Sequence, residues 1–113
     1  MTEAEKRKNT PIYSGVLMYF PDAIKEVAKC SLQGNIQHHK DKPLHWDKNK
    51  SNDHLDCMIR HSLDAGTFDS DGLRHSSKVA WRALANLQIE LDNEKTENKP
   101  KKTFKKFIDW ILQ

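Results

Sequence analysis

Two pairs of acidic residues stand at spacings that place their carboxylates on one face of a helix. Asp22 and Glu26 are four residues apart, and Asp53 and Asp56 are three apart. Residues at these separations are neighbours on a helix surface. Carboxylate oxygens from two adjacent helices, completed by phosphate oxygens, suit a divalent cation such as Mg²⁺ or Mn²⁺. Solvated charges beside lysines show the same spacing, so spacing alone leaves both interpretations open.

A second group of side chains suits phosphate and proton chemistry. Arg60 follows Asp56 by four residues and shares its helix face, whereas His61 projects about 100° further round the helix. His75 and Lys78 are three residues apart near the start of the next predicted helix. Such side chains, beside free backbone N–H groups, hold phosphate oxygens, and imidazole carries protons near neutral pH. Hydrogen bonds that only join two helices are the alternative interpretation.

The segment 35–50 has neither helical nor strand periodicity, and it holds three histidines and one tryptophan. Loops of this length in a small domain are usually functional or disordered. Asn35 and Trp46 are candidate nucleotide contacts, because a base can stack on the tryptophan ring. Anchoring of the loop to the core is the other role open to Trp46. The histidines lack a partner pair at the spacing of a zinc site.

Periodicity and capping residues predict the elements that position these side chains. Helices are expected over 21–33, from 51 or 52 to 66, from 70 or 71 to about 94, and from Thr103 onward. Gly34 is the expected stop of the first helix. The predicted fold is all-α: a small helical bundle of three principal helices with a C-terminal accessory helix. Residues 1–10 are expected to form a flexible arm, 11–92 the helical domain, and 93–113 a polar linker with the accessory helix.

Length and composition limit the class of protein. The chain has 113 residues, enough for one core. It is 36% hydrophobic and 31% charged, with a net charge of +3 and a mean hydropathy of −0.85. These values lie outside the disordered range and imply no general nucleic-acid binding. No apolar run reaches the roughly 18 residues of a membrane span, and the polar N-terminus is not a secretory signal. We therefore expect a cytoplasmic protein with reduced cysteines, Cys30 and Cys57, and no membrane partner.

Four segments together resemble the phage-associated dATP/dGTP diphosphohydrolase family. They are AIKEVAKCSLQGN, KPLHWDK, DHLDCMIRHSLDAG and DGLRHSSKVAWRALANL, in the family's order and at similar spacing. The resemblance extends over about 7–92, which is about three quarters of the chain. The resemblance depends on all four segments together, because no single segment would be enough to indicate the family.

That family is similar to the all-α nucleoside triphosphate pyrophosphohydrolases of the MazG type, which bind Mg²⁺ with acidic residues on helices and cut between the α- and β-phosphates. The resemblance implies that Glu26 and Asp56 lie in a metal site, with His61 and His75 close by. The chain departs from the MazG-type acidic quartet, because its first acidic pair is one residue too far apart and its third helix offers His75 and Lys78. A protonated lysine does not ligate metal, so we expect Lys78 to face phosphate.

The leading hypothesis is a Mg²⁺- or Mn²⁺-dependent hydrolase that converts a purine deoxynucleoside triphosphate to its monophosphate and diphosphate. In a phage, this reaction would remodel the nucleotide pool of the host cytoplasm. The expected metal ligands are Glu26, Asp53 and Asp56. The expected catalytic residues are Glu26, Asp56, His61 and His75, and those expected to bind the nucleotide and its phosphates are Arg60, Lys78, Trp46 and Asn35.

Two other functions remain open at this point. The same pocket could sequester a nucleotide, including a signalling nucleotide of host defence, without cutting it. Alternatively, the chain could be a structural protein that uses only its exposed helix faces. A homodimer or higher homo-oligomer is expected in the leading hypothesis. Ala80 and Ala83 would let another helix approach the long third helix closely, and MazG-like bundles complete themselves between subunits.

Overall fold

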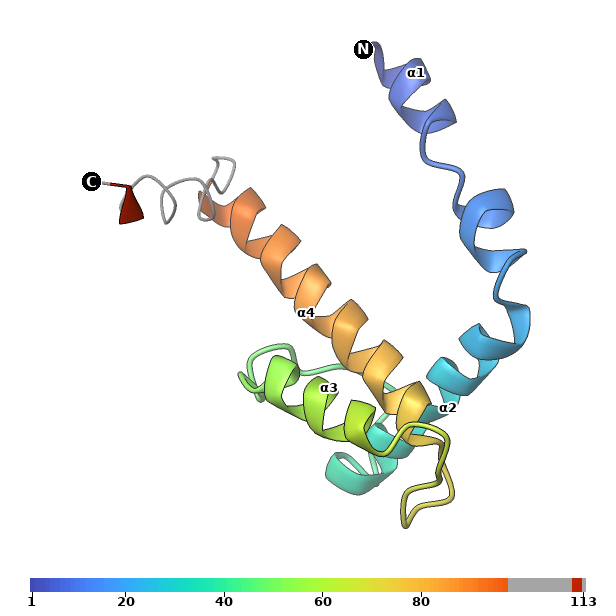
Figure 1. The fold of residues 1–113 in the computed structure, drawn as a ribbon. Coiled ribbons are helices and arrows are strands. Elements are labelled where there is room, and N and C mark those ends of the chain that lie inside the picture. Colours follow the sequence, from blue (N-terminus) through green and yellow to red (C-terminus); the bar gives the residue numbers. More distant parts are fainter. Residues whose placement is uncertain (98–110, 113) are drawn as a thin grey trace.

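The computed structural model describes residues 1–97 and 111–112, and the regular structure in them is helical (Figure 1). The elements are α1 (Glu3–Lys8), the π-helical turn η1 (Tyr13–Leu17), α2 (Pro21–His38), α3 (His54–Leu63) and α4 (His75–Glu97). Those residues contain no strand, only an isolated antiparallel bridge between Phe68 and Arg74. The prediction of a small all-α fold is confirmed. The accessory helix expected from Thr103 lies outside the described residues.

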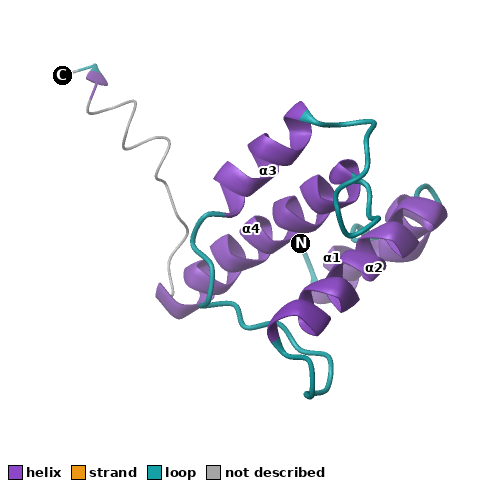
Figure 2. Ribbon diagram, turned by 90° about the horizontal axis from the view of Figure 1, so that it is seen from below, coloured by secondary structure: helices purple, strands orange, loops and turns teal. Residues whose placement is uncertain are grey.

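Helix α4 is the longest described element, and α2 and α3 pack against it. It packs against α3 along one side and against α2 along another (Figure 2). The segment that contains α1 and η1 leads away from these three helices in Figure 1. None of the described helices combines the length and apolar character needed to cross a membrane.

Side-chain burial is low for a domain of this size. Among the described residues, the only hydrophobic side chains that are buried are the small ones of Cys57 and Ala85, each 3% exposed. Many large apolar side chains are exposed on η1, α2, α3 and α4. The three packed helices therefore enclose a small core and leave much apolar surface uncovered.

Three local features differ from the sequence-based expectation. The first principal helix does not stop at Gly34 but continues to His38, because one glycine inside a helix costs only about 1 kcal/mol. Helix α4 begins at His75, later than predicted, since the preceding residues form a turn. The N-terminal arm contains α1, which Thr2 and Glu5 stabilise through a reciprocal capping box.

Candidate functional site

A cavity of about 500 Å³ lies among α2, the loop after it, α3, the α3–α4 turn and α4. Its walls combine cationic, anionic, imidazole and indole side chains. Five of the residues singled out from the sequence line it: Asn35, Trp46, Arg60, His61 and Lys78. The structure thus brings together the residues expected to bind phosphate and base, although they come from four separate segments.

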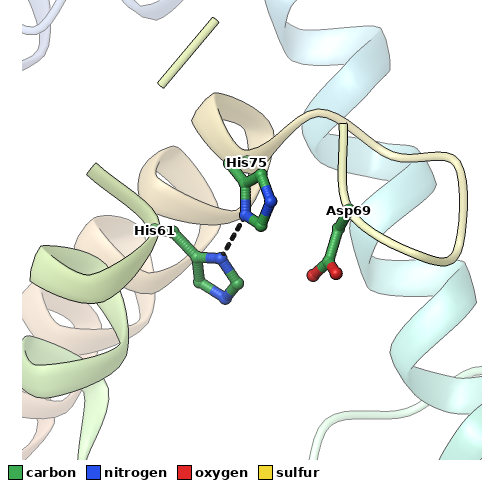
Figure 3. Close-up of side chains that lie close together, drawn as sticks. All are labelled: His61, Asp69 and His75. Atoms are coloured by element: carbon green, nitrogen blue, oxygen red, sulfur yellow. Dashed lines mark hydrogen bonds between the residues drawn. The ribbon is translucent and has the colours of Figure 1, made fainter. Parts of the chain in front are cut away.

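Three potential metal ligands converge where α3 meets α4. One ligand atom each from His61, Asp69 and His75 lies within 4.8 Å of the other two, and this is the only such group of three among the described residues. His61 is in the last turn of α3, and His75 is the first residue of α4. Figure 3 shows the two imidazoles facing each other, with the Asp69 carboxylate beside them. Their Nδ1 atoms are 2.8 Å apart.

The turn between α3 and α4 holds Asp69 in place through backbone hydrogen bonds. The Asp69 N–H donates to the Leu73 carbonyl at 2.8 Å, and the His75 N–H donates to the Thr67 carbonyl at 3.1 Å. Gly72 closes the turn with φ +82°, a conformation that glycine adopts without a steric penalty. The hydrogen bonds of this turn, rather than those of a helix, therefore hold Asp69 in position.

Lys78 joins two carboxylates of this turn. Its ammonium donates to Asp69 Oδ2 at 2.6 Å and to Asp71 Oδ2 at 2.7 Å. The Lys78 hydrogen bond, with a second bond from the Ser70 N–H, lowers the pKa of Asp69 to about 2. Burial alone lowers the pKa of Lys78, but its bonds to both carboxylates outweigh this effect and raise it. All three groups are therefore charged at neutral pH.

The electrostatic surroundings of His61 favour its neutral form. Burial is the largest cause of its lowered pKa, and the nearby His75, Lys78 and Arg60 lower it further. A neutral imidazole has a free lone pair on one nitrogen. His61 therefore has the protonation state that metal ligation or proton acceptance requires.

Two indoles and a buried imidazole form an aromatic wall of the cavity. The ring centroids of Trp46 and Trp81 are 5.6 Å apart, and His54 lies 6.4 Å from Trp46. His54 is only 5% exposed. Its Nδ1 lies 3.0 Å from Arg82 Nη1, whereas its Nε2 has no hydrogen-bond partner. Because arginine only donates, Nδ1 accepts, and Nε2 carries the proton of the neutral ring.

The loop after α2 is tied to the helices at several points. The Asn35 side chain donates to the Lys42 carbonyl and accepts from the His45 N–H, both at 3.3 Å. Lys48 forms an ion pair with Asp92 of α4 at 2.8 Å. Trp46 is half-buried, and its ring lies against that of Trp81. Asn35 thus positions the loop, and Trp46 combines an anchoring contact with a place on the cavity wall.

The carboxylates expected to bind metal do not converge within the chain. Glu26 pairs with Lys29 at 2.7 Å on the surface of α2. Asp53 accepts from the Cys57 thiol at 3.4 Å, which is the largest cause of its lowered pKa, and it lies 3.8 Å from Arg82. Asp56 is exposed. None of the three acids lines the cavity, and their assignment as metal ligands stays a prediction.

Sequence reasoning missed Asp69, Asp71 and His54 as members of the site, and it noted Arg82 only as an arginine near His75 and Lys78. One signal was available for the aspartates: Asp69, Asp71 and Gly72 form an Asp-x-Asp-Gly sequence that is typical of a tight turn. His54 and Arg82 are 28 residues apart and meet only through the packing of α3 on α4. No family model, curated protein or solved structure matches this chain. The resemblance to the dATP/dGTP diphosphohydrolases therefore remains a hypothesis based on its motifs.

Proposed function

We propose that the protein hydrolyses a purine deoxynucleoside triphosphate to the monophosphate and diphosphate in the cavity between α2, α3 and α4. The observation that supports this proposal best is the convergence of cations, potential metal ligands and an aromatic wall in one space. A nucleotide presents phosphates and a base, and these wall groups complement both. The motif resemblance supplies the reaction: water adds to the α-phosphorus and loses a proton to the solvent. The bond from that phosphorus to the oxygen shared with the β-phosphorus breaks, and diphosphate leaves with the electron pair.

The phosphates would be held by cations from two helices. Arg60 and Arg82 line the cavity from α3 and α4. Lys78 has three N–H donors, and two of them bond to carboxylates, so one is free for a phosphate oxygen. Guanidinium groups bind phosphate through paired, charge-assisted hydrogen bonds. In this proposal the guanidinium groups also stabilise the charge that develops on the phosphate group as diphosphate leaves.

The base would lie near the aromatic wall. Trp46 is half-buried, which leaves part of its indole open to a ligand, and stacking on such a ring is tolerant of base identity. Asn35 is only 8% exposed and its amide bonds to the loop backbone, which favours a structural role over direct reading of the base. Its contribution is to keep the loop that carries Trp46 in position.

The Mg²⁺ or Mn²⁺ requirement belongs to the proposal as an expectation from the resemblance. The acidic residues of one chain do not fit that role, because Glu26, Asp53 and Asp56 do not form a converging group. Mg²⁺ commonly binds through substrate phosphates with only one or two protein carboxylates, so a Mg²⁺–nucleotide complex can still be the substrate.

A second copy of the chain is the partner that we propose for the uncovered apolar surface. Tyr13 of η1 and Phe20 just after it are 68% and 53% exposed, and Leu84 and Leu87 of α4 are 53% and 50% exposed. Apolar surface on this scale marks an interaction site, and most soluble oligomers are symmetric homo-oligomers. Light scattering should give at least twice the 13.1 kDa mass of the chain. A monomeric mass across the micromolar range would exclude this assembly.

The proposed function is tested by product analysis with a matched pair of variants. The protein is incubated with each of the four deoxynucleoside triphosphates and Mg²⁺ or Mn²⁺, and the products are separated by ion-exchange chromatography. We expect dATP or dGTP to yield the monophosphate and diphosphate. Arg60→Gln should weaken nucleotide binding about 10- to 150-fold, as expected for a charged hydrogen bond. Arg74→Gln is the control, because Arg74 lies over the Phe68 ring and not on the cavity wall.

The same experiment separates the competing functions. Tight binding of an intact nucleotide that still depends on Arg60 would favour the non-catalytic, sequestering alternative. Absence of both binding and turnover for every nucleotide would reject the proposal. Equal effects of Arg60→Gln and Arg74→Gln would place the nucleotide outside this cavity.

A further inference from the structure

We propose that His61, Asp69 and His75 bind a divalent transition-metal ion of the Fe²⁺, Co²⁺ and Ni²⁺ class in preference to Mg²⁺. The proposal concerns a site other than the acidic residues implied by the resemblance, and it does not depend on hydrolysis. A protein that only sequesters a nucleotide can hold the same ion.

The donor set selects the class of ion. Two imidazoles and one carboxylate form a mixed nitrogen and oxygen set, which suits iron, nickel and similar ions, whereas Mg²⁺ prefers oxygen ligands alone. The three ligand atoms already lie within 4.8 Å of one another. They come from α3, the turn and α4, so the fold rather than one helix sets their separation.

The two imidazoles are close enough to share one ion. Their Nδ1 atoms are 2.8 Å apart across a hydrogen bond, and metal–nitrogen bonds are about 2.1 Å long. Both nitrogens can therefore reach one ion once the rings turn their lone pairs toward it.

The hydrogen bond between the imidazoles is compatible with exchange of a proton for a metal ion. Two Nδ1 atoms at 2.8 Å bond only when one carries a proton and the other offers its lone pair. An ion between them needs both lone pairs, so binding releases that proton. His61 and His75 would then act as ligands, and this role replaces the proton transfer expected from the sequence.

Asp69 keeps the capacity to bind an ion while it is held by its neighbours. Oδ2 accepts from Lys78 at 2.6 Å, and Oδ1 accepts from the Ser70 N–H at 2.7 Å. Each carboxylate oxygen has a second lone pair. Lys78 and Ser70 would orient the carboxylate, as outer-shell partners do in known metal sites.

The occupied site would attract anions. Asp69 and Asp71 carry two negative charges, and Lys78 and a divalent ion carry three positive ones, which leaves one net positive charge before Arg60 is counted. Three protein ligands leave coordination positions open on a six-coordinate ion. Because His61 and Asp69 line the cavity, these positions would accept oxygens of a phosphate bound there.

Calorimetry with Ni²⁺ and with Mg²⁺ tests the proposal on the full chain, stripped with EDTA and free of any histidine tag. We expect one Ni²⁺ per chain, with proton release that appears as a dependence of the heat on the buffer. Mg²⁺ should not compete at tenfold excess over Ni²⁺. His61→Ala, His75→Ala and Asp69→Asn should each weaken Ni²⁺ binding at least about 100-fold, more than the loss of an outer-shell partner costs.

The loop histidines supply the control. The rings of His39 and His45 lie 4.1 Å apart, so they are the main competing place for Ni²⁺. A His39→Ala/His45→Ala double variant should keep Ni²⁺ affinity unchanged. Loss of binding in this variant, retained binding in the three site variants, or no binding to the wild type would overturn the proposal. Helix content by circular dichroism identifies a site variant that fails to fold, and the near-isosteric Asp69→Asn then decides the question.

Discussion

Two sets of candidate metal ligands in this protein invite the same interpretation, but the fold positions them differently. Asp69, with His61 and His75, converges at the joint between α3 and α4. Glu26 and Asp56 lie apart on helix surfaces, where Glu26 pairs with Lys29 and Asp56 is exposed. The first set lies at the cavity, and the second does not line it.

The difference shows what helical spacing can and cannot establish. A separation of three or four residues places two side chains on one helix face, but a metal ion needs ligands that approach from several directions. The α3–α4 turn supplies the third direction here, because its backbone bonds hold Asp69 against two helix ends. Sites of this kind depend on tertiary structure and are only weakly visible in local spacing.

The largest expected effect comes from testing the two sets against each other. Asp69→Asn should lower kcat/KM for the nucleotide at least about 100-fold, since it removes a charge from the converging set and leaves Lys78 with one carboxylate fewer. The measurement is steady-state diphosphate release by each purified variant. Glu26→Gln and Asp56→Asn are the comparison, because both change one carboxylate outside the cavity.

The reverse result would be equally informative. If Glu26→Gln and Asp56→Asn abolish turnover and Asp69→Asn does not, the metal is held as the motif resemblance implies. The carboxylates of a single chain would then be insufficient, and a second copy would have to complete the site.

A second contrast concerns stability and uses the same substitution in each set. Lys78→Met removes the cation that bonds to both Asp69 and Asp71. It should destabilise the fold by about 2–3 kcal/mol, less than the loss of a partner in a fully buried pair, because Lys78 is one-fifth exposed. Lys29→Met breaks only the exposed pair with Glu26 and should cost about 0.5 kcal/mol or less. Urea unfolding of both variants measures the loss in the free energy of unfolding. Equal losses would show that the ion pairs of Lys78 stabilise the fold no more than the surface pair of Lys29 does.

The sequence predicted the helices better than their ends. The apolar stripe with Ala80 and Ala83 correctly indicated the long α4, because its period is sustained over many turns. Gly34 was a misleading stop signal, since the helix continues at modest cost to His38. The capping box of α1 was visible as a Thr2-x-x-Glu5 pattern, so that helix could have been predicted.

The site was predictable in its residue types but not in its connections. Arg60, His61, Lys78 and Trp46 were selected for chemistry that cavity residues perform, and all four line one space. The pairing of Lys78 with two turn carboxylates was not foreseen, because it spans nine and seven residues across a non-helical turn. Single-helix periodicity contains no information about such contacts.

A smaller effect on nucleotide binding is expected at the aromatic wall, and it tests whether Trp46 contacts the nucleotide. Trp46→Phe keeps a ring against Trp81 and should leave the melting temperature nearly unchanged. It should weaken nucleotide binding about fivefold, the low end of the stacking contribution of an aromatic side chain. Both quantities are measured on one preparation. A lowered melting temperature with unchanged affinity would assign Trp46 to anchoring alone.

The smallest expected change is in the reactivity of the two cysteines, one at the cavity and one outside it. Cys30 lines the cavity, whereas the buried Cys57 lies beside Asp53. Burial is the largest cause of the raised pKa of the Cys30 thiol. Because the thiolate is the reactive form, its alkylation by iodoacetamide should be slower at pH 8 than that of a free thiol and should accelerate above pH 9. A bound nucleotide should slow alkylation of Cys30 several-fold, and Cys57 should stay unreactive throughout. Mass spectrometry of the digested protein assigns each modified site. If a nucleotide that binds tightly protects neither thiol, the ligand does not lie against the α2 side of the cavity. Cys30 would then not distinguish the cavity from the region around Cys57.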